Sequence, residues 1–326
     1  MERIFHLLSD QEAATLFGLH DEHLKLLEAE FGVKTVSRGQ ELTVSGPEAG
    51  AAKVGRLLDQ LLGLIRSGQY LRRHDVVYAI RALQADERVD LAPIYTDRIE
   101  VLSKRQFVVP KTAGQKAYLD SIRRHDIVFA IGVAGTGKSY LAMAMAVNAL
   151  KRQEISRIIL TRPAVEAGES LGFLPGTFEE KVNPYLRPLY DALYEMVDMD
   201  RLQRSIEKGI VEVAPLAFMR GRTLNDSFIV LDEAQNCTPE QMKMFLTRLG
   251  FDSKAVITGD VTQSDLPQGK MSGLAHAREI LRGIEGIGFV EFSETDVVRH
   301  ELVQKIVRAY EQNGKRKSDA SPDKQT

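Results

Sequence analysis

The chain has few of the features that define several large classes of proteins. Its 326 residues include a single cysteine, Cys237, so an internal disulfide framework is excluded. The beginning, Met1–Ile4, has no long apolar region of the kind found in signal peptides, and we expect no membrane-spanning segment. The formal net charge is only −2, so any binding of nucleic acid must depend on local patches. These absences favour a cytoplasmic protein.

The composition provides for a sizeable core. The length of the chain allows about two domains, and its apolar content of 44% is ample for a core. Cys237 has no base at a suitable spacing, so we interpret it as a core or turn residue rather than a nucleophile. Basic residues gather in short clusters, each of which is either a binding patch or a solvated face. The clusters are Arg66 with Arg72, Arg73 and His74; Arg123, Arg124 and His125; and Lys315, Arg316 and Lys317.

The most informative segment is a glycine-rich octapeptide between the apolar run 127–131 and the helix-forming run 141–146. A strand that ends in such a turn presents backbone N–H groups to an anion, and the following helix aims its positive end at the same place. We predict a Walker A loop for ATP, with Lys138 on the β- and γ-phosphates and Ser139 on Mg²⁺; the alternative is a turn without a ligand. The predicted nucleotide-binding residues are Gly132, Val133, Ala134, Gly135, Thr136, Gly137, Lys138, Ser139 and Tyr140.

A second apolar strand, residues 228–231, ends in two adjacent acids, Asp232 and Glu233. Asp232 is placed to hold Mg²⁺ through its water shell, and Glu233 to polarise a water molecule that attacks the γ-phosphorus. The pair alone could be a solvated strand end. Together with a Walker A loop it predicts hydrolysis at the β–γ bond, with Lys138 and Glu233 as catalytic residues and Ser139 and Asp232 as the metal site.

A third apolar strand, residues 255–258, leads into a polar turn that contains Asp260 and Gln263. Polar groups at that end of a parallel sheet face the nucleotide. A carboxamide can donate to a phosphate oxygen and accept from the attacking water, so Asp260 or Gln263 is a candidate sensor of the γ-phosphate. An ordinary turn is the alternative interpretation.

We predict four segments: a small α+β unit at 1–67, a basic connector with a short helix at 68–111, a nucleotide unit at 112–314 and a disordered tail at 315–326. Apolar strands with helices between most of them predict an α/β unit of the P-loop NTPase (RecA-like) class, its mostly parallel sheet covered on both faces. A Pro- and aromatic-containing stretch between 172 and 196 predicts a functional loop. The expected strands are 127–131, 158–161, 210–213, 228–231, 255–258 and 288–292.

The small unit has its own pattern: a helix at 22–31, a hairpin of strands 33–36 and 41–44, and a helix at 48–66. This order resembles the minimal KH-type RNA-binding domain, in which a Gly-x-x-Gly loop approaches nucleic-acid phosphates. The corresponding loop here is Gly18–Asp21, with an acid in place of the second glycine. Contact with RNA and a purely structural or subunit-packing role therefore both remain open.

Several motifs occur together over nearly all of residues 107–310: 129–142, 161–169, 171–176, 219–223, 231–236 and 258–260. In combination they resemble the PhoH family of bacterial ATPases. The resemblance implies an ATPase domain similar to one core domain of superfamily 1 helicases, a link to RNA metabolism and, often, a ribonuclease partner. Val133 stands where the family frequently has proline, a change that only shapes the turn.

The resemblance also implies roles for two residues outside the Walker motifs. Gln115 is placed like the glutamine with which helicases read the adenine edge, so it would favour ATP over GTP. Arg162, in Arg162-Pro163 after the second strand, is placed where helicase-like proteins contact the nucleic-acid backbone. An exposed polar residue and a simple surface arginine, respectively, are the alternatives.

Phosphoryl transfer gains greatly from an arginine opposite the phosphate loop, and superfamily 1 helicases take it from a second core domain that this chain lacks. We therefore predict that a neighbouring subunit supplies it in a head-to-tail ring, a hexamer by hypothesis. Candidate donors are Arg299, Arg220 and Arg222.

The sequence thus predicts an Mg²⁺-dependent ATPase of the PhoH type that is coupled to an RNA-related task or helicase-like remodelling. Two other classes stay open. One is an RNA-binding adaptor that nucleotide switches without significant turnover, and the other is an ATPase that acts on a protein partner.

Overall fold

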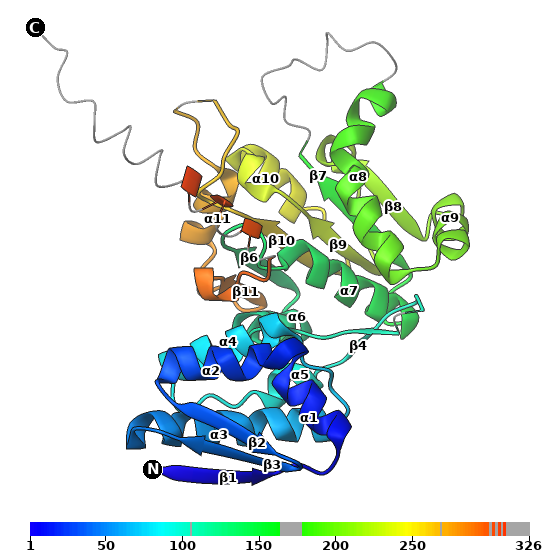
Figure 1. Cartoon of the computed structure of the whole chain (residues 1–326). Coiled ribbons are helices and arrows are strands. Elements are labelled where there is room, and N and C mark those ends of the chain that lie inside the picture. Colours follow the sequence, from blue (N-terminus) through cyan, green and yellow to red (C-terminus); the bar gives the residue numbers. More distant parts are fainter. Residues whose placement is uncertain are drawn as a thin grey trace, which may run out of the picture.

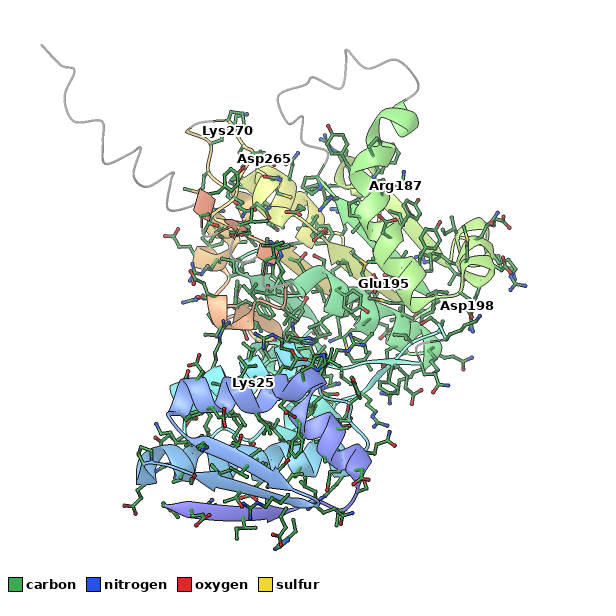
Figure 2. The ribbon with its side chains drawn as sticks, in the orientation of Figure 1. Lys25, Arg187, Glu195, Asp198, Asp265 and Lys270 are labelled. Carbon is green, nitrogen blue, oxygen red and sulfur yellow. The ribbon has the colours of Figure 1, made fainter. Side chains whose placement is uncertain are left out.

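The computed structural model describes residues 1–104, 106–163, 178–267 and 269–299 and residues 302, 303, 306, 307, 309 and 310; for 178–183 it describes the backbone alone. Figure 1 shows a small N-terminal unit beneath a larger unit built on an extended sheet. In Figure 2, Lys25 marks the smaller unit, whereas Asp265 and Lys270 mark a loop at the far end of the larger one. No helix within these residues is both long and apolar enough to cross a membrane.

A three-stranded antiparallel sheet begins the chain. β1 (Glu2–His6) pairs with β3 (Glu41–Ser45), which also pairs with β2 (Lys34–Arg38), in the order β1-β3-β2. The predicted hairpin of β2 and β3 is confirmed. β1 was not predicted, because only Phe5 of its five residues is buried and the alternating pattern is correspondingly weak.

Three helices pack on this sheet and on one another: α1 (Asp10–Phe17), α2 (Glu22–Phe31) and α3 (Glu48–Arg66). The N-terminus of α1 is capped by Ser9, whose hydroxyl accepts from the Glu12 N–H at 3.1 Å. Gly18, at φ 74°, ends α1 and begins the short turn before α2. The order is thus strand, two helices, two strands, helix, and the segment Gly18–Asp21 joins the two adjacent helices.

The segment 68–111, predicted as a connector, adds two helices to the core of the N-terminal unit. α4 (Arg73–Ala85) and α5 (Ala92–Thr96) pack against α3, and α4 also packs against α2. Leu83 and Leu91 are completely buried in the same apolar cluster as the leucines of α3. The predicted short helix is confirmed, and it is part of a packed unit rather than a tether. The short strands β4 (Ile99–Glu100) and β5 (Phe107–Val108) then lead into the larger unit.

The larger unit is built on a six-stranded sheet in the order β11-β6-β10-β9-β7-β8, all of whose neighbouring strands are parallel. β-Branched and other apolar residues form near-continuous runs in these strands, as expected for a sheet covered on both faces. Each predicted strand is present, and the predicted α/β class is confirmed. The strands are β6 (Ile127–Ile131), β7 (Arg157–Arg162), β8 (Val211–Pro215), β9 (Ser227–Leu231), β10 (Lys254–Gly259) and β11 (Ile287–Glu291).

The helices divide between the two faces of this sheet. Alternate residues of β6 show the division: Val128 joins the core on one face and Phe129 the core on the other. The first face is covered by α6 (Ala113–Arg124), α7 (Lys138–Lys151), α8 (Phe178–Met196) and α9 (Met199–Glu207); the second by α10 (Pro239–Leu246) and α11 (Gly273–Ile280).

The predicted functional loop between 172 and 196 is corrected in part. Residues 164–177 lie outside the described residues, but residues 178–196 form the helix α8, with Pro184 and Pro188 inside it. The helix is stabilised by the buried stripe Leu186, Leu189 and Leu193, whose spacing places these side chains on one face against the sheet. This burial outweighs the cost of the prolines, which misled the prediction.

Polar contacts join the two units beside α6. The hydroxyl of Tyr78 on α4 accepts from the Ala113 N–H at 2.6 Å, and the Lys111 ammonium lies 3.1 Å from the buried Asp75 carboxylate. Asp97 accepts from the Arg123 guanidinium at 2.6 and 2.7 Å. The first two contacts hold α4 next to the start of α6, and the third joins the end of α5 to the last turn of α6.

We expect Leu83→Ala to lower the free energy of unfolding by about 2–5 kcal/mol, because it opens a cavity in the shared core of the N-terminal unit. Urea denaturation measures the change, with Leu8→Ala as the control, since that side chain is 70% exposed. A flexible connector at residues 68–111 would instead make the two variants equally stable.

Candidate functional site

The candidate site lies at the carboxyl edge of the sheet, where strand register brings its residues together. Thr161 of β7 pairs with Leu231 of β9, and Ile257 of β10 pairs with the same Leu231. The residues that follow, Arg162 and Thr258, therefore flank Asp232 on either side. The octapeptide 132–139 leaves the adjacent strand β6 at this edge.

The predicted Walker A loop wraps around the N-terminus of α7. Gly135 and Gly137 have φ values of 88° and 81°, a region in which other residues are strained. A Cβ at Gly135 would also overlap the Arg299 side chain, and one at Gly137 would lie 3.1 Å from Gln115. The loop thus lies before a helix N-terminus, a geometry in which backbone N–H groups bind anions.

Lys138 folds back over its own loop. Its ammonium donates to the carbonyls of Gly132 at 2.6 Å and Val133 at 2.8 Å, and lies 3.3 Å from the Thr136 hydroxyl. Burial lowers the pKa of Lys138, and the nearby carboxylates of Asp260, Glu233 and Asp232 oppose that shift. The ammonium therefore occupies the concave side of the loop and is surrounded by oxygen atoms that an anionic ligand would replace.

Asp232 joins the loop to the sheet. Its Oδ1 accepts from the Ser139 hydroxyl at 2.5 Å and from the Thr258 hydroxyl at 2.7 Å, and its Oδ2 lies 3.2 Å from the Arg162 guanidinium. The structure thus brings the two predicted metal ligands, Ser139 and Asp232, into direct contact. Carboxylate and hydroxyl oxygens are the ligands that Mg²⁺ prefers.

Glu233 is held from both sides. Its Oε1 accepts from Arg162 at 2.7 Å and its Oε2 from the Gln235 carboxamide at 2.5 Å. Its backbone is left-handed, with φ 53°, an uncommon conformation for a residue other than glycine. Arg162 also donates to the Tyr185 carbonyl on α8 at 3.0 Å, so the guanidinium is directed into the site and the surface-arginine alternative is wrong.

The two candidate sensors differ in their surroundings. Asp260 is 5% exposed; its Oδ1 accepts from the N–H and hydroxyl of Thr262, whereas its Oδ2 is buried and has no hydrogen-bond partner within the described residues. Gln263 is exposed, and its backbone N–H closes a turn on the Asp260 carbonyl at 3.1 Å. Of the two, Asp260 is the one with an oxygen atom available inside the protein.

Gln115 lies next to the loop but is already engaged. It is 4% exposed, which rules out the exposed-residue alternative. Its carboxamide accepts from the Lys111 N–H at 2.6 Å and donates to the Thr136 carbonyl at 3.0 Å. Recognition of adenine by Gln115 stays a prediction.

The three candidate arginines occupy different places. Arg299 lies against Gly135 of its own chain, and the Val298 N–H donates to the Gly135 carbonyl at 3.0 Å. Arg222 pairs with both oxygens of Glu212 at 2.6 and 2.7 Å. Arg220 is exposed after η3 (Leu216–Met219). The described structure thus provides two arginines, Arg162 and Arg299, in cis beside the site.

The residues fit a magnesium–triphosphate group. The glycine positions leave the loop open to phosphate, and Ser139 with Asp232 offers oxygen ligands. The unpaired Asp260 Oδ2 and the buried, equally unpaired Thr161 hydroxyl face no other partner among the described residues.

Two participants were missed from the sequence. The sequence analysis predicts Thr258 only as the last residue of a strand. A polar residue at the end of an apolar strand is, however, the same signal that identifies Asp232. Gln235 lies in the motif 231–236, and no role was predicted for it; its Nε2 donates to Glu233 at 2.5 Å and its Oε1 accepts from the Asp260 N–H at 3.0 Å. Cys237 is buried, and burial raises its pKa to about 12, in agreement with a core residue.

Comparison with known proteins agrees with this geometry. A family model described as PhoH-like protein matches residues 107–311. The chain belongs to the PhoH family. The PhoH-like protein of Bacillus subtilis (strain 168) is 53% identical over 305 residues, which cover 94% of this chain and 96% of that protein.

Other matches cover different shares of this PhoH-family chain. The PhoH-like protein of Mycobacterium tuberculosis (strain ATCC 25618 / H37Rv) is 53% identical over 90% of this chain and 84% of its own. Protein PhoH of Escherichia coli (strain K12) is 45% identical over 205 residues, which cover 62% of this chain and 58% of that protein. Among solved structures, the Pif1 helicase from Candida albicans is 14% identical over 60% of this chain and 42% of that chain, with a TM-score of 0.32.

We expect Arg162→Ala to lower the free energy of unfolding by about 3 kcal/mol, because it leaves Asp232 and Glu233 without their shared cation. Millimolar Mg²⁺ should restore a larger part of that loss in Arg162→Ala than in the control Arg222→Ala, which breaks an ion pair with Glu212 away from the carboxylate pair. Urea denaturation with and without Mg²⁺ measures both. An equal response of the two variants to Mg²⁺ would contradict a metal site at Asp232.

Proposed function

We propose that this PhoH-family chain binds ATP with Mg²⁺ and hydrolyses it at the β–γ bond. The observation that carries the proposal is the direct contact of Ser139, after the glycine-rich loop, with Asp232, beside which stands the second acid Glu233. A phosphate loop, a metal site and a base thus meet at one edge of the sheet. The PhoH family model covers these residues.

The residues divide the work as follows. The loop amides of 132–139 and the Lys138 ammonium bind phosphate oxygens, for which Lys138 leaves the carbonyls of its own loop. Mg²⁺, held by Ser139 and Asp232, would supply charge neutralisation of the phosphates. Glu233 accepts a proton from the attacking water, and Asp260 orients that water or senses the γ-phosphate.

Glu233 must exchange partners before it can act as a base. Both of its oxygens accept hydrogen bonds in the present arrangement, from Arg162 and Gln235. A shift of Arg162 toward phosphate oxygens would free Oε1 and place a cation where negative charge develops. Arg162 also donates to the Tyr185 carbonyl, so this exchange connects the site to α8.

We also propose that hydrolysis is coupled to RNA. The N-terminal order β1, α1, α2, β2, β3, α3, with Gly18 between two helices, supports the predicted KH-like unit. The acid Asp21 in that loop and the left-handed His20 argue for weak phosphate contact there. In the alternative function, that of an ATPase acting on a protein partner, the partner is a ribonuclease or another protein.

One reason for the proposed ring, the lack of an arginine near the phosphate loop within the same chain, no longer applies. Arg162 and Arg299 lie beside their own loop, so an arginine from a neighbour is not needed for charge alone. Exposed Arg220 is the candidate that can reach a second subunit. A homo-oligomer, with a hexameric ring as its form, remains our proposal on the symmetry argument for head-to-tail contacts.

Steady-state hydrolysis of ATP with Mg²⁺ tests the function. We expect turnover in the parent and a loss of about 100-fold or more in Glu233→Gln, with ATP binding retained, because the variant lacks the base but keeps the loop. Glu240→Gln, an exposed acid on α10, is the matched control and should match the parent.

Single-stranded RNA is then added to each variant. A higher rate in the parent that disappears in Glu233→Gln supports coupling to RNA, whereas a rate that ignores RNA favours a protein partner. Tight ATP binding without turnover in the parent, and no effect of Glu233→Gln, would favour the switched adaptor.

A further inference from the structure

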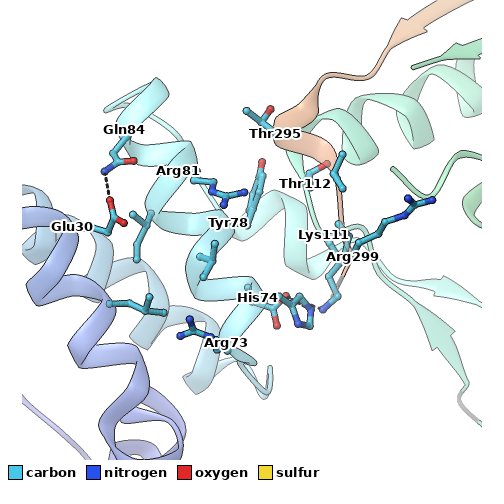
Figure 3. Close-up of a pocket in the computed structure, with 16 residues that line it drawn as sticks. Glu30, Arg73, His74, Tyr78, Arg81, Gln84, Lys111, Thr112, Thr295 and Arg299 are labelled. Carbon is cyan, nitrogen blue, oxygen red and sulfur yellow. Dashed lines mark hydrogen bonds and ion pairs between the residues drawn. The ribbon is translucent and has the colours of Figure 1, made fainter. Parts of the chain in front are cut away.

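A cavity of about 300 Å³ lies beside the phosphate loop, between the two units. One wall is α4 of the N-terminal unit, and the opposite wall consists of residues 111–112 and the segment 295–299. Figure 3 shows Tyr78 and Arg81 of α4 pointing toward the part of the chain that carries Thr112 and Thr295. The volume is at the lower end of the range for small-molecule sites.

This cavity shares its wall with the candidate site. Arg299 lines the cavity and also lies against Gly135 in the loop, and the neighbouring Val298 is bonded to the Gly135 carbonyl. On the other side, Lys111 lines the cavity and its N–H is held by Gln115, which is bonded to Thr136 of the loop. The cavity and the phosphate loop are thus connected through Arg299 on one side and through Lys111 and Gln115 on the other.

The side chains that line the cavity suit a ligand in which a flat, polar ring is joined to an anionic group. The Tyr78 ring and the Arg81 guanidinium are planar surfaces of the kind on which nucleobases stack. The acids of the cavity are already bonded: Asp75 to Lys111, and Glu30 to Gln84 at 3.3 Å. The other charged side chains of the lining are basic: Arg81, Arg299 and Arg73, which pairs with Glu22 at 3.8 Å, while burial lowers the pKa of His74.

We propose that this cavity holds the purine and ribose of the nucleotide whose phosphates occupy the Walker A loop, so that α4 of the N-terminal unit forms one wall of the nucleotide site. The inference rests on the proposed function. It explains why a nucleotide unit needs α4 held to α6 by the bond between Tyr78 and Ala113.

Calorimetric titration with Mg²⁺–ATP and with Mg²⁺–tripolyphosphate, which lacks base and ribose, tests the proposal on the full chain. We expect Tyr78→Leu and Arg81→Ala to weaken ATP binding about tenfold each and to leave tripolyphosphate binding unchanged. Tyr78→Phe keeps the ring but loses the hydroxyl that accepts from the Ala113 N–H, so it separates stacking from the attachment of α4 and should bind ATP more tightly than Tyr78→Leu does. Arg88→Ala, exposed beyond the end of α4 and outside the cavity, is the surface control.

Unchanged ATP binding in Tyr78→Leu and Arg81→Ala would overturn the proposal, as would an equal loss for ATP and tripolyphosphate, since the residues would then act through the phosphate site. Photolabelling with 8-azido-ATP provides a second readout that needs no substitution. Label within residues 73–85 or 295–299 supports the site, and label only outside the cavity lining overturns it.

If the proposed function itself is wrong, the titrations give a different result. In that case the parent binds neither ligand, or Lys138→Ala binds ATP as well as the parent does, and the cavity proposal falls with it. If Lys138→Ala loses both ligands while the variants of α4 match the parent, only the cavity proposal is wrong.

Discussion

The arrangement of the whole site depends on one buried carboxylate, that of Asp232. A carboxylate at 5% exposure is costly unless hydrogen bonds and a cation compensate for its lost hydration. Ser139, Thr258 and Arg162 provide that compensation, each from a different element. The charge therefore ties α7, β10 and β7 to the end of β9, and it brings the two proposed metal ligands, Ser139 and Asp232, into contact.

The same compensation explains the contacts of the other charged groups. Arg162 serves two acids at once, and Lys138 satisfies its ammonium with carbonyls of its own loop. Each of these contacts is one that a magnesium nucleotide can replace with a similar one. Under the proposed function, nucleotide binding exchanges these side-chain contacts and leaves the sheet in place.

Much of this could be predicted from sequence because the signals are local. Apolar runs identify every strand of the larger sheet, three of them with a glycine or an acid directly after the run, and the glycine-rich octapeptide predicts the loop from adjacent residues. Arg162 and Thr258 beside Asp232 could not be predicted in the same way, because their meeting depends on strand order and register. Helix α8 was not predicted because its two prolines argue against a helix, although a buried apolar stripe runs along it. The packing of α4 on α2 and α3 could not be predicted, because it depends on contacts between distant parts of the chain.

The most direct test of the central claim is a crystal structure of this chain with Mg²⁺ and a non-hydrolysable ATP analogue. The account predicts the triphosphate in the loop 132–139, with the metal ion on Ser139 and Asp232 and the Lys138 ammonium moved from the Gly132 and Val133 carbonyls to phosphate oxygens. A nucleotide bound elsewhere, or one in the loop with Lys138 still on those carbonyls, would contradict it.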